Sequence, residues 1–372
     1  MSETEVTMDA MDMGAIMGMW MLRLLAAALG SFIVVGTLVS AVKTFVLPRA
    51  VNVWLTRVVF TAVGFTFRLR AKKAATYEQR DEIMALFAPL ALLIMPVVLL
   101  TLILIGYMFL FWALDPQPLA VELRLSGSSL LTLGNAAGDT LGYKFLEFSE
   151  AMIGLILVAL LIAYLPTIYT AFSKRETAVA LLETRAGSPP SAQEFLTRSY
   201  RTGELQTLGE FWTVWQTWFA EIRESHTSLA PLSFFRSPQN NMSWVTAAGA
   251  VLDAASLLLS TVDVPRDPRA AFCIRSGYLA LQDIAAFFDL EFDPHPSPTD
   301  PISISRDEFD ETAAALAEQG VPIVADLDQA WRDFAGWRVN YDTVLLSLAG
   351  VTMAPYALWA SDRSAVVPGK RP

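Results

Sequence analysis

The feature that most constrains this chain is the segment Ile83–Leu114, which contains no charged side chain. A helix needs about 20 apolar residues to cross a bilayer, because every backbone N–H and C=O must be hydrogen-bonded within the segment. Two further segments meet this requirement: Leu24–Leu47, charged only at Lys43, and Ala151–Phe172, which is uncharged. The sequence therefore predicts an all-α protein with at least three membrane-spanning helices.

A fourth segment, residues 51–67, fits two interpretations. Its apolar residues recur at helical spacing, but Arg57 would cost about 2.5–3.5 kcal/mol at the centre of a bilayer. The segment is either a short span or a helix lying at the membrane interface. A fourth span favours an even count that keeps the acidic N-terminus on the inner side, so we expect one or two spans within the N-terminal region, residues 1–82.

Charge is distributed unevenly, since the net charge of −10 is the sum of +1 for residues 1–175 and −11 for residues 176–372. The positive-inside rule places the basic clusters on the cytoplasmic side, so segment 83–114 runs outward and segment 151–172 runs inward. These clusters are Arg68, Arg70, Lys72, Lys73 and Arg80, then Lys174 and Arg175. We expect a multi-pass plasma-membrane protein with a cytoplasmic C-terminal domain whose acidity argues against a nucleic-acid partner.

The segment between the last two spans is semi-apolar from Leu119 to Asn135 and contains Thr132-Leu133-Gly134. Such a segment can re-enter the membrane. Non-helical backbone at membrane depth is tolerated only where it is buried in protein or lines a wet cavity. A short helix followed by an extended Thr/Gly strand therefore predicts a pore or binding site, and an ordinary external turn is the alternative.

The order of long helix, short helix, Thr-x-Gly strand and long helix over residues 83–176 resembles the pore module of tetrameric potassium and related cation channels. Thr132, Leu133 and Gly134 match the start of that family's Thr-Val-Gly-Tyr-Gly filter, and Asn135 takes the place of its tyrosine. The resemblance also implies that Ser128 and Ser129 end the pore helix. It implies a homotetramer that conducts K⁺ or Na⁺.

Ala136 occupies the position of the second filter glycine, where a left-handed backbone would be strained for any residue with a Cβ. A shortened or wider filter with weak selectivity is the result to expect. Residues 115–150 carry a net charge of −3 that would attract cations, and Asp139, Glu147 and Glu150 are candidate outer-mouth acids. Alternatively, Glu147 and Glu150 are solvated residues near a helix N-terminus.

The inner helix offers two candidate bending sites, Gly154 and Pro166. Glycine in a membrane helix also serves close packing, and Pro166 would equally suit the helix end. The inner helix is almost wholly apolar, with Thr167, Tyr169 and Thr170 as polar side chains near its cytoplasmic end, and an apolar constriction can gate by dewetting. The regular arginine spacing of a voltage sensor is missing from the apolar segments.

After a linker at residues 177–200, residues 201–372 predict a cytoplasmic α-helical domain. Its first helix carries an aromatic seam that either faces the domain core or joins subunits below the pore: Leu208, Phe211, Trp212, Trp215, Trp218, Phe219 and Ile222. Further helices are expected near 242–260, 268–288, 305–319 and 325–348. Ser305 and Glu308 form a capping box at the start of the third.

No catalytic or metal-binding pattern is visible. His226, His295 and Cys273 are far apart in sequence, and the acids of 289–311 lack the spacing of a calcium loop, so a solvated acidic face is the simpler interpretation. We therefore expect a cation-channel subunit without cofactor rather than an enzyme. The alternative is a membrane-anchored sensor or scaffold with a non-conducting pore-like segment, which would be a monomer or dimer.

Overall fold

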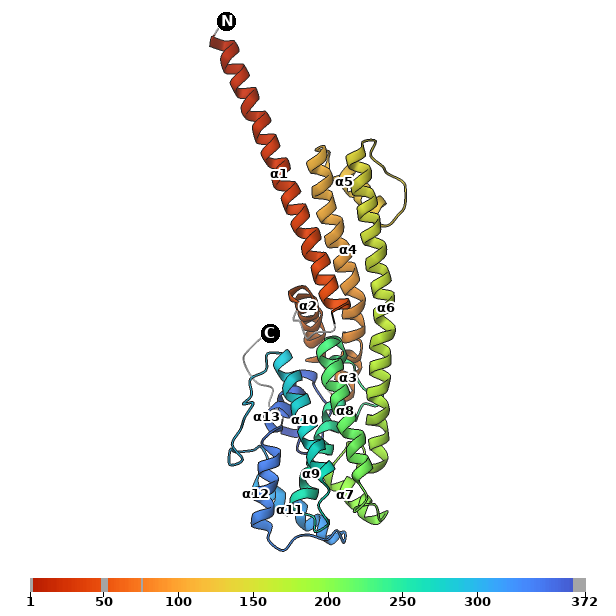
Figure 1. The fold of residues 1–372 in the computed structure, drawn as a ribbon, viewed down its shortest axis with the longest axis vertical. Helices are drawn as coiled ribbons and strands as arrows, with labels where there is room; N and C mark the ends of the chain where they lie inside the picture. Colours follow the sequence, from red (N-terminus) through yellow and green to blue (C-terminus); the bar gives the residue numbers. More distant parts are fainter. Residues whose placement is uncertain (1–2, 48–52, 75, 364–372) are drawn as a thin grey trace. The chain divides into compact units, whose positions relative to one another are not determined.

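The computed structural model describes residues 3–47, 53–74 and 76–363, with the backbone alone for 3–12 and 15 (Figure 1). Within these ranges all regular structure is helical, apart from one isolated antiparallel bridge between Val262 and Ile323. The all-α prediction is confirmed. The chain divides into two compact units, residues 1–63 with 90–167 and residues 64–89 with 168–372, so the expected N-terminal region 1–82 contributes to both.

Three helical segments are long and apolar enough to cross a membrane, as predicted: Ile16–Phe45, Tyr77–Leu114 and Leu141–Ala186. They belong to α1 (Glu3–Phe45), to α3 and α4 (Tyr77–Ala85 and Phe87–Leu114) and to α6 (Leu141–Ala186). The helices extend beyond the apolar segments, since charged residues such as those after Phe172 in α6 can continue a helix. Part of the expected linker 177–200 is accordingly the last turns of α6.

Helix α2 (Trp54–Ala71) is not among the helices that are long and apolar enough to span. Besides Arg57, its last turn contains Arg68 and Arg70, which shortens the uncharged stretch. One face of its first half is buried in the first unit through Leu55 and Val59, while Trp54 is 75% exposed. The structure therefore has three helices long and apolar enough to span a membrane among its described residues, and α2 is not one of them.

The core of the first unit is built on one stripe of α4. Its buried residues recur every fourth position and are at most 3% exposed: Met95, Leu99, Ile103, Tyr107 and Phe111. Because α4 is apolar all round, the sequence alone does not mark this face. Helix α1 crosses α4 where Gly30 faces Gly106, and a Cβ at Gly30 would lie 2.6 Å from the Gly106 carbonyl oxygen. Small residues thus allow the two backbones to approach.

The second unit packs its helices around α9 (Trp244–Ser260), nearly all of whose side chains are buried. Its neighbours are α7 (Ala192–Arg201), α10 (Pro268–Phe287), α12 (Leu327–Arg338) and α13 (Asp342–Thr352), while α8 (Gly209–Ser228) packs against α10 (Figure 1). The unit also contains α3, the part of α6 after Thr167, α11 (Arg306–Glu318) and the short 3₁₀ helices Ala230–Phe234 and Ser361–Arg363. Because α9 is surrounded by other helices, it has to be mostly apolar on every side.

The aromatic seam of α8 faces this core, which settles the choice between its two interpretations. Trp212, Trp215, Trp218 and Phe219 are each at most 3% exposed. The capping box is also confirmed, since Ser305 accepts from the Glu308 backbone and the Glu308 carboxylate accepts from the Ser305 N–H at 2.8 Å. Both features lie in local sequence pattern, which is why they could be predicted.

Segment 325–348 was expected as one helix and is two, α12 and α13. The break follows Arg338, a fully buried arginine whose Nη1 lies 2.5 Å from Asp253 Oδ1 and whose Nε lies 2.8 Å from Asp342 Oδ1. Tyr341 donates to the same Asp253 at 2.8 Å. The backbone turns here because two side chains from the α12–α13 junction, Arg338 and Tyr341, converge on Asp253 of α9.

Arg175, expected only as a basic flank of the inner helix, is a buried anchor within the second unit. Its guanidinium donates to the carbonyls of Leu232 and Phe235, both at 2.8 Å, and Nη1 lies 3.2 Å from His226 Nε2. Burial, followed by the positive charge of Arg175, lowers the pKa of His226, so the imidazole stays neutral and accepts the hydrogen bond. Neighbouring Lys174 remains exposed and pairs with Glu221 at 2.6 Å.

Candidate functional site

The short helix expected before the Thr-Leu-Gly segment forms as α5 (Leu119–Leu130), which contains Ser128 and Ser129 in its last turn. Pro118 precedes it with extended backbone angles, as suits a residue that lacks an N–H donor. Its buried face consists of Glu122, Leu125, Ser126, Ser128, Ser129 and Leu130. Helical periodicity thus gives α5 one face for its neighbours and one exposed face.

α5 lies beside the long helices α4 and α6 (Figure 1), and Ser126 joins it to both. Its hydroxyl lies 2.5 Å from Glu150 Oε1 of α6 and 3.1 Å from the Leu104 carbonyl oxygen of α4. Near this contact, Tyr107 of α4 and Ser149 of α6 share a hydrogen bond of 2.9 Å. Polar side chains therefore fix α5 between α4 and α6, which is how hydrogen bonds act between helices where water is scarce.

The C-terminal end of α5 rests on Gly154. A Cβ at this position would lie 2.6 Å from the Leu130 carbonyl oxygen, closer than side chains tolerate. Gly154 is therefore a close-packing residue, in line with the second of its two interpretations. Pro166 lies inside α6, which continues to Ala186, so the idea that it marks the helix end is wrong.

Thr132 and Leu133 close α5 in a Schellman motif rather than continuing as an extended strand. The Leu133 N–H donates to the Ser128 carbonyl at 2.8 Å, and the Thr132 N–H donates to the Ser129 carbonyl at 3.1 Å. Thr132 takes the left-handed conformation with φ 53°, and Gly134 follows with φ 70°. The expected extended strand is absent from residues 131–140, because the helix end uses these N–H groups to satisfy its own carbonyls.

Ser128 also holds residues 135–140, the returning segment that leads back to α6. Its hydroxyl accepts from the Ala136 N–H at 3.1 Å and lies 3.0 Å from the Ala136 carbonyl oxygen. Ala136 is not among the described non-glycine residues with positive φ, whereas Thr132 is. The backbone strain expected at Ala136 therefore falls on Thr132, since the helix end and not the filter pattern sets the local conformation.

The four candidate filter residues Thr132, Leu133, Gly134 and Asn135 are all exposed in this single chain. The fold brings them close to Ser128 and Ser129 through the turn that ends α5. Asp139 is exposed farther along the returning segment. These residues lie at the C-terminal end of α5, where the helix dipole is negative and favours a cation.

Glu147 and Glu150 are both buried, so their interpretation as solvated residues is wrong. Glu147 accepts from the Gly138 N–H at 2.6 Å and from Lys144 Nζ at 3.2 Å, which ties the returning segment to the start of α6. Glu150 is fully buried against Ser126. Glu147 therefore holds the loop against α6, and Glu150 holds α5 against α6.

Glu122 is the residue at this site that the sequence interpretation missed. It lines a cavity of about 370 Å³ beneath the returning segment, together with Asp115, Asn135, Ala136 and Tyr143. Glu122 is 1% exposed and accepts from the Gln117 N–H at 3.2 Å, but its Oε2 has no hydrogen-bond partner among the described residues. Its spacing of four from Ser126 on a semi-apolar helix is the signal that could have revealed it.

The chemistry of the site concerns charge and backbone dipoles. In the described part of the chain no three His, Cys, Asp or Glu side chains are grouped to hold a metal ion. Cys273 and His226 are buried in the second unit, and burial raises the pKa of the Cys273 thiol, which keeps it protonated and unreactive.

Comparisons of the chain with models of protein families, with curated proteins and with solved structures find no match.

Proposed function

We propose that this chain is a subunit of a monovalent-cation channel that assembles as a homotetramer in the plasma membrane. The observation that carries the proposal is the position of α5 beside α4 and α6. Its C-terminal end contacts Gly154, thirteen residues after Leu141, which corresponds to about 20 Å along α6. A short helix and a loop at this depth suit a re-entrant pore segment, because irregular backbone in a membrane must be buried or line a wet cavity.

Electrostatics supports the same conclusion. The negative end of the α5 dipole lies at Thr132, where it favours a cation. The net charge of −3 over residues 115–150 would be repeated around a fourfold axis. The Schellman turn and the replacement residues Asn135 and Ala136 leave no room for a long row of carbonyl sites, so the proposed pore discriminates weakly between K⁺ and Na⁺.

With three spans the proposed topology differs from the even count expected from the sequence. The basic residues from Arg68 to Arg80 stay inside, so α4 runs outward and α6 runs inward. The second unit then carries the cytoplasmic domain, and the acidic N-terminal end of α1 lies outside. α2 lies at the inner interface rather than crossing it.

Ion flux into liposomes that contain the purified full-length protein tests this function. Gly134→Ala places a Cβ at φ 70°, which costs about 1–2 kcal/mol, and should lower flux about tenfold if the strain displaces the filter. Gly203→Ala is the matched control, since Gly203 has φ 75° and equally open surroundings but lies in the second unit. Equal flux through both variants, or no flux of K⁺ or Na⁺ through the wild type, would contradict the proposal.

One observation favours the second candidate, a membrane-anchored sensor or scaffold. The Thr132 turn is complete within one chain, as an ordinary helix end would be. This candidate predicts a monomer or dimer without flux. Light scattering of the protein in detergent distinguishes the two, because only the channel requires a fourfold particle.

A further inference from the structure

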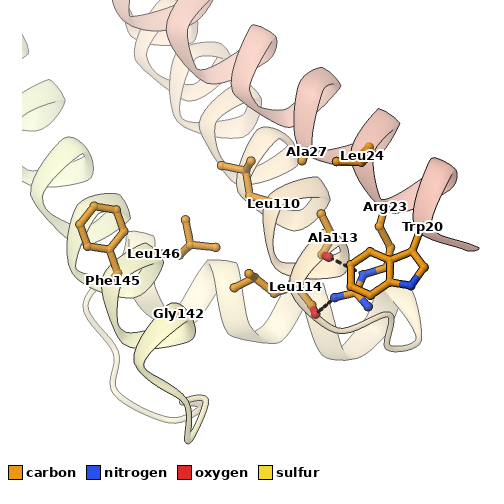
Figure 2. Close-up of a pocket in the computed structure, with 10 residues that line it drawn as sticks. All are labelled: Trp20, Arg23, Leu24, Ala27, Leu110, Ala113, Leu114, Gly142, Phe145 and Leu146. Atoms are coloured by element: carbon orange, nitrogen blue, oxygen red, sulfur yellow. Dashed lines mark hydrogen bonds between the residues drawn. The ribbon is translucent and has the colours of Figure 1, made fainter.

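A second cavity, of about 320 Å³, lies in the first unit between α1, α4 and the start of α6 (Figure 2). Its volume is within the range of about 300–1,000 Å³ that is typical of ligand sites. The walls are apolar apart from one arginine, and the lining residues used below are Trp20, Arg23, Ala27, Leu110, Leu114 and Phe145. This cavity is separate from the candidate filter and from the Glu122 cavity.

The crossing of α1 and α4 creates this space. The two helices touch where Gly30 faces Gly106, so they can diverge toward the Leu114 end of α4. Figure 2 shows Leu110 and Leu114 of α4 on one side of the opening and Phe145 of α6 across from them. Phe145 is 72% exposed, so this cavity is a wedge between α1, α4 and α6 that is open to its surroundings.

Arg23 stands at the end of the wedge and points toward the C-terminal carbonyls of α4 (Figure 2). Its Nε donates to the Ala113 carbonyl at 2.7 Å and its Nη2 donates to the Leu114 carbonyl. These bonds use two of the five N–H donors of the guanidinium. Among the described residues its charge has no salt-bridge partner, and the guanidinium also lies over the face of Trp20, 4.7 Å from the ring centroid.

We propose that this wedge binds an anionic glycerophospholipid, with an acyl chain between the helices and the phosphate at Arg23. Lipid is the medium that surrounds apolar walls on helices able to cross a membrane. Tryptophan beside a basic residue at the end of an apolar segment is typical of the headgroup level. A guanidinium with remaining planar donors suits phosphate oxygens, and its uncompensated charge selects an anionic headgroup. The site does not depend on the proposed channel function.

Native mass spectrometry of the full-length protein tests the site with phosphatidylglycerol and phosphatidylcholine of identical acyl chains. One basic residue near the headgroups is worth about fivefold in affinity, so the first phosphatidylglycerol should bind about fivefold more tightly than phosphatidylcholine. Arg23→Gln keeps an amide donor for α4 and should abolish this preference, whereas Arg23→Lys should retain it. Arg124→Gln removes an exposed arginine that does not line the cavity and should leave the preference unchanged.

Ala27→Phe supplies an independent measurement, because it fills the wedge without altering the charge. It should remove the tightest lipid of either headgroup while helical circular dichroism stays unchanged. A wild-type preference retained by Arg23→Gln, or tight lipid retained by Ala27→Phe, would overturn the proposal. It would be overturned equally if the wild type bound no lipid and Ala27→Phe changed its oligomeric state, since a second copy would then be the occupant.

Discussion

Gly154 lies directly against the carbonyl of Leu130, at a distance that leaves 2.6 Å for an added Cβ. The contact joins the end of α5 to α6 and sets where the candidate filter begins. Its geometry is incompatible with any side chain at 154 unless the backbone of α5 moves. The position of the Thr132 turn therefore depends on a hydrogen atom in place of a methyl group.

Gly154→Ala should shift α5 away from α6 and destabilise the first unit by about 1–3 kcal/mol, the usual cost of overpacking. The midpoint of thermal unfolding in detergent should fall. Gly127→Ala is the matched control, because Gly127 lies in α5 with nothing within 4 Å of its added Cβ. This control should be neutral or slightly stabilising, since alanine favours a helix. Equal midpoints for the two variants would show that the contact does not constrain α5.

Ser128→Ala removes the hydroxyl that bonds both the N–H and the carbonyl of Ala136. The free energy needed to open the returning segment should fall by about 1–3 kcal/mol, because a buried hydrogen-bond partner is lost. The segment should therefore open more often. Hydrogen–deuterium exchange should become faster at residues 133–138. Ser129→Ala serves as the control, since among the described residues the Ser129 hydroxyl bonds the Leu125 carbonyl of its own helix, at 3.0 Å, and no other group. Faster exchange in the control alone would contradict this role for Ser128.

Arg338→Met should destabilise the second unit by about 3–5 kcal/mol, because it leaves the buried Asp253 without its cation. Chemical unfolding of the full-length protein, followed by tryptophan fluorescence, measures the loss. Arg332→Met changes an exposed arginine of the same helix, bonded to Gln329, and should alter stability little. A small effect at Arg338 would mean that the network is replaceable by apolar packing.

Glu308 links the start of α11 to Arg363, and the hydrogen bond from that guanidinium lowers the pKa of the carboxyl to about 2. A glutamate in an unfolded chain has a pKa of about 4.3. The ionised carboxylate therefore contributes its full stability above that value and loses it as the pH falls toward 2. Wild type should exceed Glu308→Gln in unfolding free energy at pH 7, and the difference should vanish near pH 2.

Glu311→Gln, on the exposed surface of the same helix, is the control for this acid titration. Its stability should follow that of the wild type over the whole range. A difference between wild type and Glu308→Gln that did not change between pH 5 and pH 2 would contradict the ion pair as its source.

The spans and the helices of the second unit could be predicted because their signals are local. Charge-free runs such as Ile83–Leu114 mark membrane segments, and three-and-four spacing marked the seam at Trp212 and Trp215 as helical. Whether α2 crosses the membrane was harder to predict. Its apolar spacing is compatible with a span, whereas the cost of placing Arg57 at the bilayer centre argues against one. The break after Arg338 had no local signal, because it follows from Asp253, distant in sequence.

The candidate site was predicted in part. A short helix ending near Ser129 followed from the semi-apolar pattern and the resemblance to pore modules. The conformation of the next residues did not, because a helix end satisfies its carbonyls with whatever N–H groups follow, here those of Thr132 and Leu133. Burial of Glu147 and Glu150 likewise depends on where α5 packs.

The sequence by itself determined the helical class, the three apolar segments and the acidic second half, since composition and periodicity depend only on neighbours along the chain. Tertiary structure alone decided which stripe of α4 is buried, which contact excludes a side chain at Gly154 and which carbonyls accept from Arg23. These are contacts between residues far apart in sequence, and in helices that are apolar on every side no periodic pattern records them.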